Sequence, residues 1–168
     1  MLFSEFLSNF EMLIQAVRVF CYFLMIKQVL CIDDDLITLK LLEFNIKSQF
    51  FAGQVFKFSG AEDALVWLQN NAPSTPGKES FGLVVFLDLS LPGLNGWQFL
   101  NLFLRDHLAS FPESKVVILS ASVSDEDLLK AKDYGVVIDF IPKPMRANDI
   151  QRLKENVALK RYFITDPF

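Results

Sequence analysis

Carboxylates, a hydroxyl and a lysine follow four short apolar runs of this 168-residue chain. One of these runs, residues 83–87, is Val-rich and bounded by turn residues, which is typical of a strand buried on both faces. Because the carboxyl ends of parallel strands share one edge of a sheet, the side chains that follow such runs can converge there. The polar groups at the four ends are Asp33-Asp34-Asp35, Asp88, Ser120 and Lys143.

These groups together predict phosphoryl-transfer chemistry. Carboxylates in one crevice repel each other by ~1 kcal/mol in water at 4 Å, and by ~4 kcal/mol at an effective dielectric of 20. They therefore require a cation or raised pKa values. Oxygen ligands without a nearby His or Cys suit Mg²⁺, which commonly bridges carboxylates to a phosphate, and a lysine and a hydroxyl can donate to phosphoryl oxygens. We interpret the set as a nucleophilic carboxylate with a metal, a counter-charge and a sensing hydroxyl.

Each feature alone has a simpler interpretation. An Asp triplet after a strand is typical of a helix N-terminus, and a single Asp at a strand end is as typical of a turn. The sequence Pro142-Lys143-Pro144 alone indicates a rigid turn. The combination of all these groups at four strand ends is what makes the prediction specific.

Strands and helices alternate along the chain, which predicts an α/β fold with a parallel sheet and helices on both faces. We expect strands at 28–32, 54–58, 83–88, 115–120 and 136–141, and helices at 35–48, 61–70, 96–108, 124–134 and 148–160, with Ser124 and Asn148 as N-caps. The second strand ends at Ser59 and Gly60 and brings no ionisable group to the shared edge.

The motifs VLCIDDD, FLDLSLPGLNG, VVILSAS and DFIPKPM resemble the receiver domain of bacterial two-component response regulators, over nearly all of residues 27–160. Asp88 is followed by Pro92 and Gly96 at the spacing of the phospho-acceptor loop of that family. The resemblance implies a flavodoxin-like, doubly wound (βα)5 sandwich with the strand order 2-1-3-4-5. Because only one helix and a tail are expected after the last strand, we expect a stand-alone regulator that is not an enzyme beyond its own phosphotransfer and dephosphorylation.

The resemblance implies a role for each site residue. Asp88 would accept a phosphoryl group from a histidine kinase or a phosphotransfer protein. Mg²⁺ would be bound by Asp33, Asp34, Asp88 and the backbone carbonyl of Ser90. Lys143 would pair with the phosphoryl group, Ser120 would move toward it, and Phe140 would rotate in response. The phosphorylated domain would then act through protein–protein contact with an unknown target or pass the group on in a phosphorelay.

Residues 1–26 precede the receiver pattern, and residues 161–168 form a short tail after it. The first segment predicts an extra helix with one apolar face, which either docks on the domain or a second copy, or lies at a membrane surface, or results from a start codon placed upstream of Met25. Its polar face has few Lys and Arg residues, which argues against the membrane. Whether the chain forms a homodimer is left open by the sequence.

A formal net charge of −4 without a basic stripe argues against nucleic acid as a direct partner. Both cysteines lie in apolar runs without a CxxC pair, which indicates buried thiols and a cytoplasmic location. Two other functions are considered. A binding module that is never phosphorylated would be expected to lack part of the acidic pair, the acceptor or the lysine. A phosphatase of the haloacid dehalogenase type requires an acid two residues after its nucleophile, where this chain has Ser90.

Overall fold

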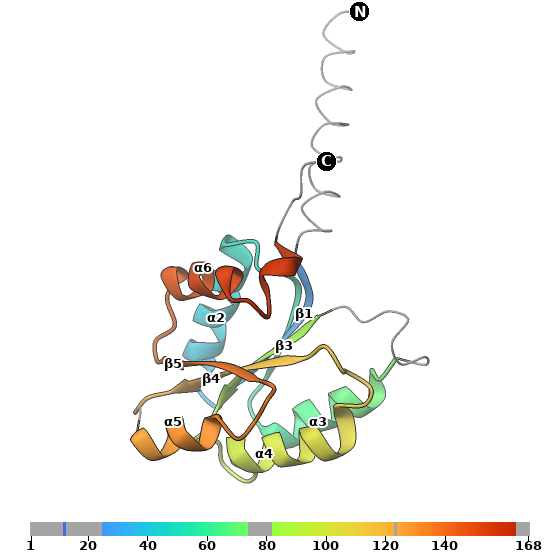
Figure 1. Ribbon diagram of the computed structural model, residues 1–168, viewed down its shortest axis with the longest axis vertical. Helices are drawn as coiled ribbons and strands as arrows, with labels where there is room; N and C mark the ends of the chain where they lie inside the picture. Colours follow the sequence, from blue (N-terminus) through green and yellow to red (C-terminus); the bar gives the residue numbers. More distant parts are fainter. Residues whose placement is uncertain (1–11, 13–24, 74–81, 123, 164–168) are drawn as a thin grey trace, which may run out of the picture.

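One parallel sheet of five strands organises the molecule. The computed structural model describes residue 12 and residues 25–73, 82–122 and 124–163. The strand order is β2-β1-β3-β4-β5, which confirms the predicted fold class and order (Figure 1). The strands are β1 (Ile26–Ile32), β2 (Ala52–Phe58), β3 (Leu83–Asp88), β4 (Lys115–Ser120) and β5 (Val137–Pro142).

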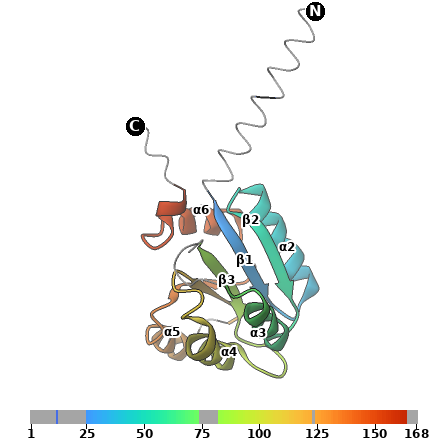
Figure 2. The same cartoon turned by 90° about the vertical axis from the view of Figure 1, so that its right-hand side faces the viewer.

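Helices cover both faces of this sheet. The segments are α2 (Leu36–Ser48), α3 (Ala61–Asn70), α4 (Gly96–Leu102), the π-helical turn η1 (Phe103–His107), α5 (Asp125–Ala131), α6 (Ala147–Glu155) and the 3-10 turn η2 (Lys160–Tyr162). Helices α2 and α6 lie on one face, and α3, α4 and α5 lie on the other (Figures 1 and 2). The fold is therefore a three-layer sandwich.

Strand side chains alternate between two hydrophobic cores. In β3, Val84 and Phe86 pack in the core beneath α2 and α6, whereas Leu83, Val85 and Leu87 pack in the core beneath α3, α4 and α5. We call these faces the α2–α6 side and the α3–α5 side. All six residues of β3 are buried, as its uninterrupted apolar sequence predicts.

Three helix predictions need correction at their ends. The helix predicted at 96–108 is α4 followed by η1, where the Leu108 N–H donates to the Phe103 carbonyl five residues earlier. This turn keeps Leu104 and Leu108 against the core. Helix α5 begins at its predicted cap, because the Ser124 side chain accepts from the Asp127 N–H at 3.0 Å. It ends at Ala131, three residues early, because the following turns close with tighter bonds to the third residue back.

The last helix, α6, does not use the predicted cap Asn148. It begins at Ala147, and the Asp149 carboxylate accepts the backbone N–H of Arg146 at 2.8 Å. It ends at Glu155 rather than near Lys160, because Asn156 leaves the helical conformation with φ −59° and ψ 133°.

The predicted N-terminal helix lies largely outside the described residues, which include only residue 12 before residue 25. The end of the C-terminal tail, 164–168, lies outside them as well. No helix in the described ranges is both long enough and apolar enough to cross a membrane.

Candidate functional site

Three carboxylates converge at the carboxyl edge of the sheet. Asp33 directly follows β1, Asp34 is the next residue, and Asp88 ends β3. Their ligand oxygens lie within 4.8 Å of one another, with Asp33 and Asp88 buried and Asp34 exposed. The predicted convergence of the first and third strand ends is therefore present in the structure.

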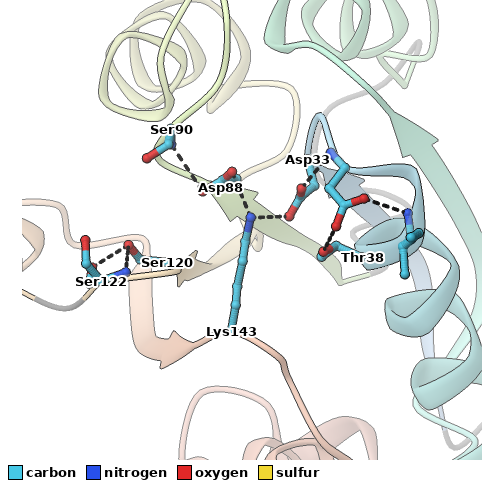
Figure 3. A network of polar contacts seen from close by, with 9 residues as sticks. Asp33, Thr38, Asp88, Ser90, Ser120, Ser122 and Lys143 are labelled. Carbon is cyan, nitrogen blue, oxygen red and sulfur yellow. Dashed lines mark hydrogen bonds and ion pairs between the residues drawn. The ribbon is translucent and has the colours of Figure 1, made fainter.

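The Lys143 ammonium lies between two of these carboxylates. Its Nζ is 2.6 Å from Asp33 Oδ2 and 2.8 Å from Asp88 Oδ2 (Figure 3). Burial by itself lowers the pKa of Lys143, but the contacts with Asp33 and Asp88 outweigh burial and raise this pKa above its ordinary value. Burial likewise raises the pKa of the Asp33 carboxyl, against the opposing effect of Lys143. A doubly paired lysine stays charged across the physiological range.

Two backbone contacts hold Lys143 in place. Its N–H donates to the Ser120 carbonyl at 2.8 Å, which extends the pairing of β4 and β5 by one residue. The Asn45 side chain of α2 donates to the Met145 carbonyl at 2.9 Å, and Met145 is buried. The lysine is therefore fixed on both sides, and the Lys143–Pro144 peptide bond is cis.

The Asp triplet divides into different roles. Asp35 is the N-cap of α2, because its carboxylate accepts from the Ile37 N–H at 2.9 Å and from the Thr38 hydroxyl at 2.8 Å. Those hydrogen bonds, the one from Thr38 first, lower the pKa of Asp35. Asp33 and Asp34 join the cluster instead. The simple helix-capping interpretation is thus correct for Asp35 and not for its two neighbours.

The loop after Asp88 folds back on the strand end. The Ser90 N–H donates to Asp88 Oδ1 at 3.1 Å, and the Gly96 N–H donates to the Leu89 carbonyl at 3.1 Å. A Cβ on Gly96 would lie 2.5 Å from the Asp88 carbonyl oxygen, so only glycine allows this approach. Ser90 is exposed at the mouth of the cluster.

Ser120 and Phe140 lie on the side of the sheet opposite to Asp88. Ser120 is buried, and its hydroxyl donates to the Ser122 carbonyl at 2.5 Å rather than to Asp88 (Figure 3). Phe140 is half-buried against the core of the α3–α5 side. Alternation places both on that side, whereas Asp88 follows Val84 and Phe86 on the α2–α6 side.

The carboxylates fit a hard divalent cation such as Mg²⁺. Asp33 Oδ2 is fully buried, accepts no hydrogen bond of ordinary geometry within the described part of the chain, and forms an ion pair with the ammonium of Lys143. Of the three carboxylates, Asp33 and Asp88 pair with the Lys143 ammonium, and the donor set of the cluster consists of oxygen alone.

Two side chains that bind the loops around the site were not identified from the sequence. Asn45 binds the loop after Lys143, and Glu62 of α3 accepts from the Leu94 N–H in the loop after Asp88 at 3.0 Å. Both act on backbone atoms of distant segments, and such contacts leave no local motif in the sequence.

The fold and its acidic edge define a flavodoxin-like α/β domain, and comparison with known proteins identifies the family. The family model of the response regulator receiver domain matches residues 29–155. The chain belongs to this family, whose members are regulatory domains of two-component signalling. Magnesium binding and phosphorylation are typical of the family.

Individual relatives support this assignment. The chain is 29% identical to the regulatory protein FilR2 of Methanothrix harundinacea, over 81% of this chain and 88% of that protein. It is 27% identical to a two-component response regulator of Arabidopsis thaliana, over 80% of this chain but only 20% of that protein's length. A crystal structure of a two-component response regulator from Cytophaga hutchinsonii matches with a TM-score of 0.67 and 27% identity, covering 78% of this chain and 96% of that one.

Proposed function

We propose that this receiver domain accepts a phosphoryl group on Asp88, with Mg²⁺ bound beside it, from a partner that carries a phosphohistidine. One observation carries the proposal: Lys143 lies 2.6 Å from Asp33 and 2.8 Å from Asp88, with Asp34 in the same cluster. A half-buried lysine that pairs with two carboxylates places positive charge where a phosphoryl group would enter. The comparisons assign the family, and the roles of individual residues rest on this geometry.

The transfer assigns a distinct task to each side chain. A carboxylate oxygen of Asp88 forms a bond to phosphorus while the bond between phosphorus and the histidine nitrogen breaks, and the departing imidazole takes up a proton. Lys143 neutralises charge on the phosphoryl oxygens, and the Ser90 N–H keeps the Asp88 carboxylate oriented. Asp33, Asp34, Asp88 and the Ser90 carbonyl would hold Mg²⁺, which supplies further neutralisation of the transferred group.

Signalling would depend on the two side chains on the α3–α5 side, Ser120 and Phe140. We assign Ser120 the task of leaving the Ser122 carbonyl and donating to the phosphoryl group, a contact available only in the phosphorylated state. Phe140 lies on the same side of the sheet and is half-buried, and we assign it an inward rotation in that state. The altered surface beside β5 would then be recognised by a downstream protein or would favour onward transfer of the group.

Phosphoryl uptake from labelled acetyl phosphate in the presence of Mg²⁺ tests the acceptor. The wild-type protein should take up label, and Asp88→Asn should fall to background because it lacks the nucleophile. Asp106→Asn is the matched control, since Asp106 is an exposed carboxylate paired with Arg105. Uptake by Asp88→Asn at the wild-type rate contradicts the assignment. A wild-type protein that neither takes up label nor responds to Mg²⁺ would instead be an unphosphorylated binding module.

A further inference from the structure

The helix that follows β2 brings a carboxylate, Glu62, close to the loop after Asp88. Glu62 lies in the first turn of α3, directly after the β2–α3 connection, and is exposed. Its Oε1 accepts the backbone N–H of Leu94 at 3.0 Å, in the loop that joins Asp88 to α4. Glu62 therefore connects the start of α3 to the phospho-acceptor loop, and it is not a member of the acidic cluster.

Two glycines lie beside this carboxylate. Gly93 has φ +73°, and a Cβ there would lie 2.7 Å from Glu62 Oε1. A Cβ on Gly60 would lie 3.4 Å from Glu62 Oε2. Gly93 is thus favoured by its left-handed backbone, and the carboxylate of Glu62 lies close beside it.

The hydrogen bond to Leu94 has a particular place in this loop. The start of the loop is tied to its own strand and helix by the Ser90 N–H and the Gly96 N–H, and its end is tied by the capping box of Asn95 with Gln98. Within the ranges that the structure describes, the bond from Leu94 to Glu62 is the one hydrogen bond that joins residues 89–95 to an element elsewhere in the chain.

We propose that Glu62 is a positioning residue that orders the phospho-acceptor loop and thereby raises the affinity of the adjacent site for Mg²⁺. The inference rests on the proposed function, because it takes the Ser90 carbonyl as a metal ligand. Mg²⁺ demands near-ideal ligand geometry, so a carbonyl on a loop with one fewer restraint binds it less well. The hydrogen bond, rather than the negative charge of Glu62, carries the effect.

Glu62→Ala and Glu62→Gln separate the hydrogen bond from the charge. Glutamine keeps an acceptor oxygen of the same reach and loses the charge. The matched control is Asp63→Ala, which removes an exposed carboxylate from the same helical turn. We expect Glu62→Ala to speed amide exchange of Leu94 in the metal-free protein and to raise the half-saturating Mg²⁺ concentration roughly tenfold. Glu62→Gln should stay within about twofold of wild type, as should Asp63→Ala.

The measurements are amide exchange by nuclear magnetic resonance, and Mg²⁺ titration followed by tryptophan fluorescence and by melting temperature. Neither requires phosphorylation, so they test Glu62 even if Asp88 takes up no phosphoryl group. Faster exchange of Leu94 in Glu62→Ala with unchanged half-saturation would reduce Glu62 to a structural role and overturn the proposal. Equal losses of affinity in Glu62→Gln and Glu62→Ala would overturn it too, because charge rather than the hydrogen bond would then be responsible.

Discussion

At the carboxyl edge of the sheet, the polar groups on the two sides differ in what they contact. On the α2–α6 side, Asp33, Asp88 and Lys143 are already joined by contacts of 2.6 and 2.8 Å. On the α3–α5 side, the Ser120 hydroxyl is occupied by the nearby Ser122 carbonyl. The charged groups are thus already in contact with one another, whereas the Ser120 hydroxyl, to which we assign the sensing role, donates to Ser122 rather than to Asp88.

Strand alternation explains this difference between the two sides. Consecutive side chains point to opposite faces, so neighbouring strand ends deliver their polar groups to different layers. A phosphoryl group on Asp88 would introduce acceptor oxygens between these two sets of side chains. Binding energy gained by Ser120 only in that state would then favour a changed conformation on the α3–α5 side.

The largest effect should come from Lys143. Lys143→Ala leaves Asp33 and Asp88 facing each other without their shared ammonium, and phosphoryl uptake should slow by roughly 100-fold or more. Lys132→Ala, which removes an exposed lysine, is the control and should retain the wild-type rate. Uptake kinetics with acetyl phosphate at saturating Mg²⁺ measure the difference. Equal rates for the two variants would show that the contacts of Lys143 on the α2–α6 side do not contribute to transfer.

A smaller effect should separate Asp34 from Asp35. Asp34→Ala removes an exposed member of the cluster, so the half-saturating Mg²⁺ concentration should rise at least roughly tenfold while metal-free stability is unchanged. Asp35→Ala removes the N-cap of α2 and should do the reverse, lowering the melting temperature without changing the Mg²⁺ response. Thermal unfolding with and without Mg²⁺ measures both. Equal loss of the Mg²⁺ response in the two variants would be inconsistent with this division.

The smallest effect on uptake should come from Ser120. Ser120→Ala removes one neutral hydrogen bond donor and should slow phosphoryl uptake by about fivefold or less. We expect beryllofluoride to change amide exchange around Phe140 in the wild-type protein, and Ser120→Ala should abolish that change. Ser122→Ala is the control, because the contact involves the Ser122 backbone and survives the substitution. A normal response of the Phe140 region in Ser120→Ala would refute the sensing role.

The sequence was sufficient to predict the parallel sheet and the polar groups at its carboxyl edge. Apolar runs that end in polar residues predict buried parallel strands, and the convergence of Asp33 and Asp88 with Lys143 follows from that topology. The division of the Asp triplet could not be predicted, because a carboxylate after a strand suits a helix cap and a metal site equally well. Glu62 was missed because its partner is a backbone N–H 32 residues away. The ends of α5 and α6 depend on local hydrogen bonds that composition does not specify.

Mapping the phosphorylated residue tests the central claim most directly, because three carboxylates have ligand oxygens within 4.8 Å of one another. The protein is phosphorylated with acetyl phosphate and Mg²⁺, reduced with borohydride so that an aspartyl phosphate becomes homoserine, and digested for mass spectrometry. We expect homoserine at position 88, with Asp33 and Asp34 unchanged. Homoserine at either of those two positions, with Asp88 unmodified, would contradict it.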